Sequence, residues 1–295
     1  MNAKMKDKFW TGVFYGVSAF IVVILVILIG YILFKGAGFL KPSFLFGEAK
    51  FGEAGGGIGP QLFNSFYMLI VALFISVPFG IGAGIYLSQY AKEGIFLNIV
   101  RLSIETMASL PSIVVGLFGL LIFVNMTNWG FTLLSGAFAI SVLNLPALTR
   151  VSENAITAAA GPVKEASLGL GATTWQTISK IILPSAIPQI STGVILAAGR
   201  IFGEAAALLY TAGMSAPKLN FSYISLIDKS SSFSIMRPAE TLAVYIWKLN
   251  SEGMVPDAAQ IANKASAVLV IMVLLFNLIA RILGKKIYES YTGKK

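Results

Sequence analysis

Long apolar runs and short polar connections alternate along the whole chain. A helix needs about 20 mostly apolar residues to cross a bilayer. The stretch 106–149 carries no charged residue and is long enough for two such helices, which a polar break at 125–130 separates. The pattern therefore predicts six spans, at about 9–34, 61–90, two within 106–149, 186–210 and 265–283.

The second predicted span contains Pro78 together with Gly80, Gly82 and Gly84. Proline and small residues allow a membrane helix to kink or to approach a neighbouring helix closely. The Gly-x-Gly-x-Gly spacing is not a dinucleotide-binding motif, because no strand–turn–helix pattern surrounds it. We therefore expect these glycines to serve helix packing.

A polar island at 164–184 interrupts the apolar pattern and predicts two short helices joined by a sharp turn. Pro162 suits a first helical position, and Gly171 suits the left-handed conformation that ends a helix. Thr173 and Gln176 have the spacing of a capping box, which would start the second helix.

The second of these helices has its own apolar pattern. Trp175, Ile178 and Ile182 recur at helical spacing, and Pro184 is expected to stop or kink the run. A compact, structured loop of this kind in a membrane protein suits docking into a partner.

Composition agrees with an all-α integral membrane protein. Hydrophobic residues make up 56% of the chain and charged residues 12%, which is about half the charged fraction expected of a soluble protein. The absence of cysteine and histidine excludes disulfides, Cys/His metal sites and histidine acid–base chemistry. The net charge of +9 does not indicate nucleic acid, because membrane proteins use Lys and Arg for topology.

The distribution of Lys and Arg predicts the orientation. Thirteen of these residues fall on the side that carries both termini and the 164–184 loop, and eight fall on the other side. The positive-inside rule therefore places both termini and the loop in the cytoplasm. We expect an N-terminal span and extracytoplasmic loop at 1–60, a transmembrane domain at 61–283 with its coupling loop at 150–185, and a basic cytoplasmic tail at 284–295.

The fifth predicted span is the one that carries charges at depth, Arg200 and Glu204. Their spacing would put them on one helical face. Charges within a membrane usually face a pathway or a partner, and a guanidinium group suits an oxyanion. In one hypothesis Glu204 holds Arg200 until an entering anion competes for it. The alternative is a self-neutralising pair that only locks a subunit interface.

Polar residues of the neighbouring spans are weaker candidates for the same pathway. Ser109, Ser112 and Asn144 have groups that would hydrogen-bond an oxyanion. Hydroxyl groups in membrane helices also commonly bond their own backbone, so a packing role is the alternative.

The polar island also resembles a known motif. Glu165-Ala166-Ser167, Gly171 and the closing Leu183-Pro184 have the spacing of the EAA loop of ABC-importer permeases, with Ser167 in place of the second alanine. The resemblance implies the type I importer permease fold with six transmembrane helices. It also implies that this loop docks into an ATP-hydrolysing subunit.

Further segments resemble the phosphate-specific branch of these permeases, and more its A-type (PstA-like) than its C-type subunit. They are 110–119, 144–146 with Arg150, 199–212 and 277–281. This resemblance implies import of inorganic phosphate across the cytoplasmic membrane of a prokaryote. It implies as partners a second, PstC-like permease, an ABC ATPase dimer and an extracytoplasmic phosphate-binding protein.

The chain carries no phosphate-binding Gly-x-x-x-x-Gly-Lys-Ser/Thr loop and no catalytic constellation, so we expect a transport subunit rather than an enzyme. We expect no cofactor or metal in this chain, with ATP and Mg bound by the partner ATPase. A permease for another oxyanion, such as sulfate, molybdate or phosphonate, is the nearest alternative. An ATPase-independent secondary transporter is a more distant one.

Overall fold

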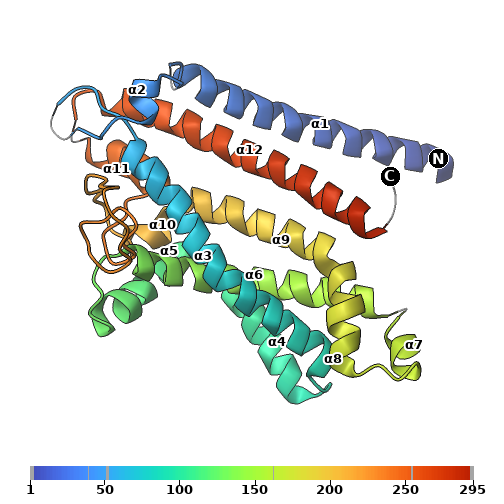
Figure 1. Ribbon diagram of the computed structural model, residues 1–295. Coiled ribbons are helices and arrows are strands. Elements are labelled where there is room, and N and C mark those ends of the chain that lie inside the picture. Colours follow the sequence, from blue (N-terminus) through green and yellow to red (C-terminus); the bar gives the residue numbers. More distant parts are fainter. Residues whose placement is uncertain (1–2, 39, 51–52, 162, 254, 293–295) are drawn as a thin grey trace.

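The computed structural model describes residues 3–292 except 39, 51–52, 162 and 254, and every regular element in that part is helical (Figure 1). The predicted helical position of Pro162 lies outside the described residues. Five described helical stretches are long and apolar enough to cross a membrane. They are α1 (Ala3–Lys35), α3 (Gly59–Ile85) with the π turn Tyr86–Tyr90, α6 (Leu133–Ala160), α9 (Leu183–Gly203) with the helical turns before it, and α12 (Ala258–Thr292).

The third predicted span is a broken pair of helices rather than one straight helix. Helix α4 (Ile95–Ala108) and helix α5 (Ser112–Gly119), which continues as the π turn Leu120–Met126, are bent by 100° relative to each other. Pro111 explains the break, because a proline disfavours helical geometry in the residue before it and has no N–H to donate. The sixth crossing exists only if this bent pair counts as one span.

Helix α3 packs against α6 at the centre of the bundle through small residues. A Cβ on Gly80 would lie 2.8 Å from the Cβ of Leu148, and one on Gly84 would lie 2.5 Å from the Cβ of Ser152. Glycine at these two positions lets the helix backbones approach closely. The expected packing role is confirmed for Gly80 and Gly84, whereas Gly82 faces open space.

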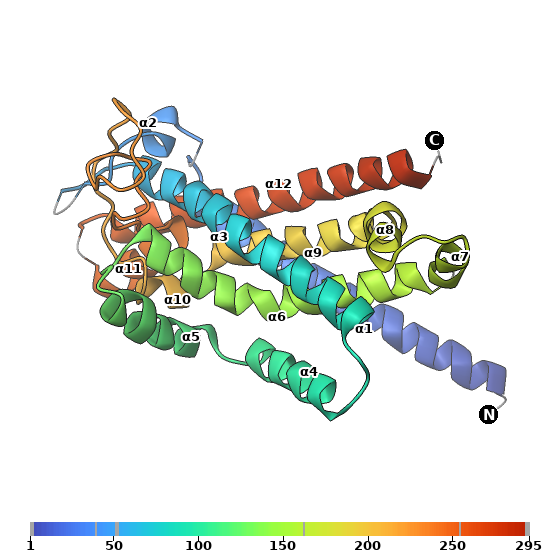
Figure 2. The ribbon, with the colours of Figure 1, turned by 60° about the horizontal axis from the view of Figure 1, so that its bottom comes forward.

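Several predicted boundaries differ from the structure. The coupling loop was predicted to begin at 150, but α6 continues as helix to Ala160, and α4 begins at Ile95, before the predicted third span. Helix α9 ends at Gly203, seven residues before the predicted end of the fifth span, and Glu204 has an extended backbone. Helix α12 runs to Thr292, so the predicted tail at 284–295 continues the last span as helix for its described part. Helix α1 lies beside α12 and buries none of its residues (Figures 1 and 2).

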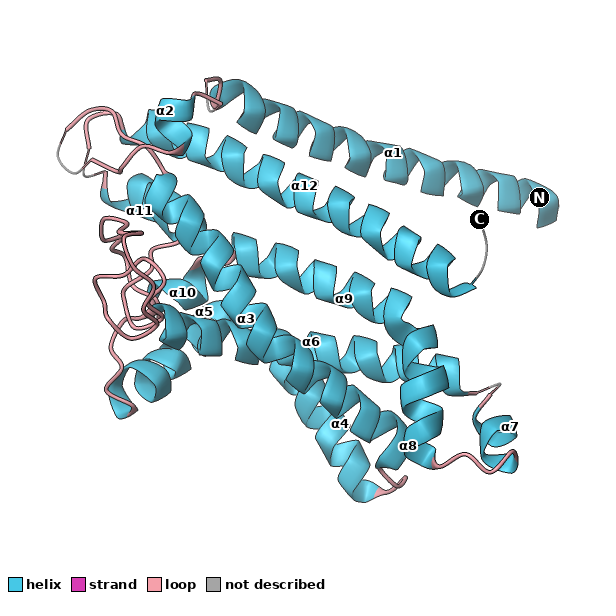
Figure 3. Cartoon of the chain, viewed as in Figure 1, coloured by secondary structure: helices cyan, strands magenta, loops and turns pink. Residues whose placement is uncertain are grey.

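The two ends of the bundle differ in structure (Figures 2 and 3). One end carries the short helices α7 (Lys164–Gly169) and α8 (Thr174–Thr177), and the start of α1 and the end of α12 lie toward it. The other end carries most of the irregular chain, with α2 (Pro42–Leu45), α10 (Ala206–Leu209) and α11 (Leu242–Glu252).

A buried polar cluster fixes the irregular chain to the start of α3. The guanidinium group of Arg237 donates to Asn64 Oδ1 at 2.7 Å and to the carbonyl of Ser232 at 2.9 Å. The fully buried Glu240 carboxylate accepts from Gln61 at 2.9 Å and from Lys248 at 3.0 Å. Because these buried groups are hydrogen-bonded, they help to order the segment between α10 and α11, together with the ring contacts of Phe221 and Phe233 with Phe63 of α3.

Candidate coupling elbow and anion pathway

Residues 164–184, which we call the coupling elbow, begin with helix α7 and a tight turn. Gly171 has φ +86°, as predicted for a residue that ends a helix. Its N–H donates to the carbonyl of Leu168 at 3.0 Å, and the N–H of Ala172 donates to the carbonyl of Ser167 at 3.2 Å. These paired bonds are a Schellman motif, which satisfies the last carbonyls of α7.

The predicted capping box that starts α8 is confirmed. The Thr173 side chain accepts from the Gln176 N–H at 3.2 Å, and the Gln176 side chain accepts from the Thr173 N–H at 2.9 Å. The turn is thus fixed from both sides, by the end of α7 and by the start of α8.

Ser167 and Thr177 join the two short helices. Both side chains are buried, and their hydroxyl oxygens share a hydrogen bond at 2.8 Å. From the sequence alone, Ser167 is interpreted only as a small substitute for alanine. The hydrogen bond shows a further role, because it requires a hydroxyl group at both positions. Each hydroxyl thereby satisfies the other away from water.

Helix α8 leads without interruption into the membrane-spanning α9. The path from Thr174 to Gly203 stays helical through the π turn Ile178–Ile182. Pro184 lies in the first turn of α9 and has no N–H to donate. The helix does not stop there as predicted; the π turn before Pro184 accommodates the proline instead. Ile178 and Ile182 are buried against Ile156 of α6.

The outer surface of the elbow is exposed and partly apolar. Leu170 is 90% exposed and Trp175 58% exposed. Trp175 therefore does not share the buried face of Ile178 and Ile182, although its spacing predicted that it would. Glu165 and Ala166 lie exposed on α7 beside this surface, whereas Leu183 and Pro184 are half-buried at the start of α9.

The structure separates the two predicted membrane charges. Arg200 is exposed on the last turn of α9, where a positive charge is favourable near the carboxyl end of a helix. Glu204 lies beyond that helix, and its carboxylate accepts from the N–H of Ala207 at 3.1 Å at the start of α10. Among the described residues the two make no ion pair, so the expectation that they share a helical face is wrong.

The other pathway candidates lie at different depths. Asn144 is buried in α6 and donates to the carbonyl of Ile140 at 2.9 Å. Ser109 is exposed after α4 and donates to the carbonyl of Thr106 at 2.7 Å, and Ser112 is half-buried at the start of α5. A bond to its own backbone was the alternative for the hydroxyl of Ser109, and it is observed there. The amide of Asn144 likewise bonds the backbone of its own helix.

Two ion pairs between α4 and α6 were missed by sequence reasoning. Arg101 contacts the buried Glu153 at 2.6 Å, and Arg150 contacts Glu105 at 2.6 Å. The residues of each pair are about 50 positions apart in sequence, so no helical spacing pointed to them. Together the pairs tie one half of the broken span to the central helix.

Comparison with known proteins agrees with this arrangement. Residues 76–290 match the family described as "Binding-protein-dependent transport system inner membrane component". The chain is 51% identical over 293 residues to the "Probable ABC transporter permease protein YqgI" of Bacillus subtilis (strain 168), covering 99% of this chain and 100% of that protein. It is 33% identical over 239 residues to the "Phosphate transport system permease protein PstA" of Yersinia pestis, covering 79% and 74%.

The fold also matches a solved transporter. A chain of a bacterial alginate ABC transporter, crystallised with its alginate pentasaccharide-bound periplasmic protein, superposes with a TM-score of 0.63 at 16% identity, covering 96% of this chain and 98% of that chain. At this identity the likeness concerns the fold alone. On the family match and the relatives together, the chain belongs to the binding-protein-dependent transport system inner membrane components, as a membrane-embedded permease subunit of an ABC importer.

Proposed function

We propose that this chain is the permease subunit of an ATP-driven importer of inorganic phosphate, and that an ABC ATPase drives it through the coupling elbow. One observation carries the proposal: an exposed, doubly capped elbow continues as an unbroken helix into the bundle. Force applied to such an element is transmitted rather than absorbed by a flexible loop. The PstA relative and the sequence segments that resemble the phosphate-specific branch support phosphate as the substrate.

The surface of the elbow suits a protein partner. Exposed large apolar side chains on a cytoplasmic loop are typical of interaction sites, and tryptophan is enriched among the residues that dominate binding energy. Leu170 and Trp175 would fill pockets of the ATPase, and Glu165 would contribute charge beside them. In this proposal ATP and Mg are bound by the partner, and a second permease and an extracytoplasmic phosphate-binding protein complete the importer.

Arg200 is the residue we assign to the anion. Its exposed guanidinium group makes no ion pair with a described residue, and it lies on the helix that the elbow continues into. A guanidinium group binds phosphate oxygens in a bidentate manner, whereas a lysine contacts them as a point charge. Arg200→Lys should therefore transport poorly even though the charge is kept.

Loss of the ATPase on purification tests the elbow. Glu165→Lys should reduce co-purification of the ATPase with the permease. Glu93→Lys, an exposed charge reversal in the connection before α4, should not. Equal retention of the ATPase by both variants would contradict the docking site.

Uptake of labelled phosphate tests the substrate. Arg200→Gln should abolish uptake while the complex still assembles, and Lys229→Gln, an exposed cation outside the spans, should leave uptake intact. If excess sulfate, molybdate or phosphonate reduces the uptake of labelled phosphate as much as excess unlabelled phosphate does, another oxyanion is favoured as the substrate. Failed assembly of Arg200→Gln would assign that residue to an interface.

The absence of cysteine allows a direct test of orientation. Single cysteines at Gly169, on the elbow, and at Ile224, in the loop at the other end, are exposed positions. We expect a membrane-impermeant thiol reagent to label intact cells at position 224 and not at 169. The reverse result would place the elbow outside and exclude an ATPase partner there.

A further inference from the structure

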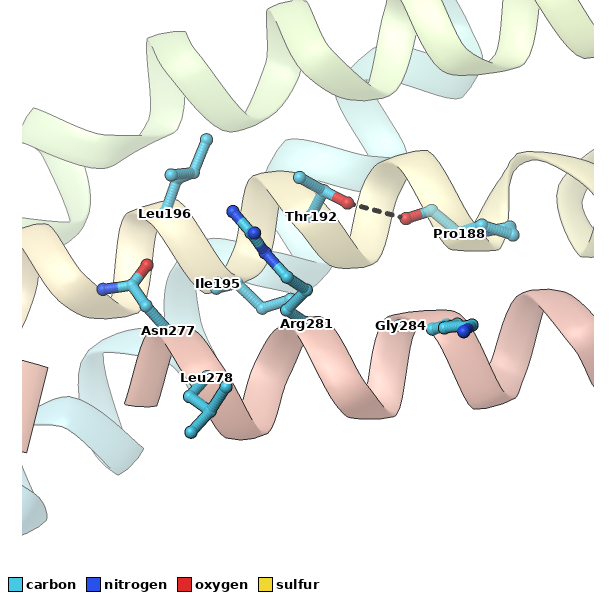
Figure 4. Close-up of a pocket in the computed structure, with 9 residues that line it drawn as sticks. Pro188, Thr192, Ile195, Leu196, Asn277, Leu278, Arg281 and Gly284 are labelled. Carbon is cyan, nitrogen blue, oxygen red and sulfur yellow. Dashed lines mark hydrogen bonds between the residues drawn. The ribbon is translucent and has the colours of Figure 1, made fainter. Parts of the chain in front are cut away.

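Helices α9 and α12 leave an open crevice between them toward the elbow end of the bundle (Figure 4). It consists of two adjoining cavities of about 490 and 540 Å³, which share Ile195 and Gly284 as lining residues. The two cavities differ sharply in chemistry, and neither was indicated by the sequence patterns discussed above.

The first cavity carries two basic side chains and two polar ones on a lining that is otherwise apolar. Arg281 and Lys285, one helical turn apart on α12, line it together with Thr192 of α9 and Asn277 of α12. In Figure 4 the Arg281 side chain reaches toward α9. Thr192 and Asn277 each bond a carbonyl of their own helix, at 3.1 and 2.8 Å, which leaves one amide hydrogen of Asn277 for a ligand.

Arg281 has no counter-charge among the described residues. Arg101 and Arg150 each contact a carboxylate at 2.6 Å, whereas Arg281 makes no ion pair with any residue that the structure describes. Lys285 has only an exposed contact with Glu289, at 3.7 Å, and such surface pairs hold little energy. Two cations over a cavity therefore favour an anionic ligand.

The second cavity is almost entirely apolar. Residues of three spans form it, among them Val77 of α3, Ile187 of α9 and Phe276, Ile279 and Leu283 of α12. Gly284 lies where the two cavities meet, and a Cβ at this position would meet nothing within 4 Å. The junction is thus open, and an alanine at this position would leave it open, whereas a larger side chain would reach into it.

We propose that this crevice binds an anionic phospholipid, with its phosphate on Arg281 and Lys285 and an acyl chain in the apolar cavity. Basic pockets between spans on the cytoplasmic side suit such headgroups, and each Lys or Arg contributes about 1 kcal/mol, or about fivefold in affinity. Free phosphate would use the basic cavity alone and gain nothing from the apolar one. The inference does not depend on which solute is transported.

The test is lipid binding to the purified complex, titrated with phosphatidylglycerol or phosphatidylcholine and followed by native mass spectrometry. Arg281→Gln and Lys285→Gln should each weaken phosphatidylglycerol binding about fivefold relative to wild type. Lys286→Gln removes a neighbouring charge that does not line the cavity, and should have no effect. Phosphatidylcholine should bind wild type no better than it binds Arg281→Gln.

A second variant tests the apolar half without removing a charge. Gly284→Leu should close the junction and lower phosphatidylglycerol binding, while Gly284→Ala should change it little. Thermal unfolding of each variant shows whether the fold is kept. If Arg281→Gln does not fold, the separate variants Lys285→Gln and Gly284→Leu still test the proposal.

Several results would overturn the proposal. One is that both lipids bind wild type equally well. Another is that Lys285→Gln and Gly284→Leu bind as much phosphatidylglycerol as wild type does. A third is that the assembled complex binds no lipid because the partner permease covers the crevice. Inorganic phosphate that displaces phosphatidylglycerol at millimolar concentration in wild type but not in Arg281→Gln would assign the site to a free anion instead.

Discussion

Gly171→Ala should weaken the elbow through backbone strain alone. Gly171 has φ +86°, and an added Cβ would meet no atom within 4 Å, so the substitution creates no clash. A left-handed residue other than glycine costs about 1–2 kcal/mol. If docking requires the turn as it is, that cost lowers the affinity of the permease for its ATPase by roughly 5- to 30-fold.

Gly169, at the end of the preceding helix α7, provides a matched control. Gly169 is exposed in the right-handed helix α7, and a Cβ there also meets nothing within 4 Å. Gly169→Ala should therefore leave docking unchanged or strengthen it slightly, because alanine is favoured over glycine in helices. Gly171→Asn should bind the ATPase with an affinity between those of wild type and Gly171→Ala, since asparagine tolerates the left-handed conformation.

The assay is ATPase binding to the detergent-purified permease, together with solute uptake per ATP hydrolysed in the reconstituted complex. Gly171→Ala should lower both, and Gly169→Ala neither. If the two alanine variants bind the ATPase equally well, the partner does not recognise this turn, and docking does not require a rigid elbow.

Three further predictions concern stability in detergent. Gly84→Ala should destabilise the bundle by about 1–3 kcal/mol because its Cβ would lie 2.5 Å from that of Ser152, whereas Gly82→Ala, facing open space, should be neutral or stabilising in thermal unfolding. Arg101→Gln should lower the unfolding temperature more than Glu153→Gln does, because it leaves a carboxylate with 6% exposure unpaired. Burial raises the pKa of Glu240 above its ordinary value of 4.5, so the folded state binds the extra proton. Stability should then fall as pH rises from about that value through the folded pKa, and Glu240→Gln should flatten this slope in unfolding measured against pH.

How much of the structure the sequence predicts depends on the range of the interactions. The apolar runs locate the spans, and Gly171 with the Thr173 capping box locates the elbow, because each is a local pattern. The break before Pro111 also had a local signal, but the long uncharged run around it favoured a continuous span. The contact of Arg237 with Asn64 joins residues 173 positions apart, and no periodicity within one helix reveals it.

The placement of Arg200 changes how coupling would work. It lies on the same continuous helical path that begins at Thr174, about 39 Å away along an ideal axis. In the proposed function, a movement of the elbow would therefore shift Arg200 directly, without a relay of side chains between two sites. Gly193 lets α9 approach Val151 of α6 closely, and in this proposal α9 would pivot at that contact. Because Glu204 bonds the start of α10 rather than Arg200, release of the anion in the proposed function would come from this movement and not from competition by a neighbouring carboxylate.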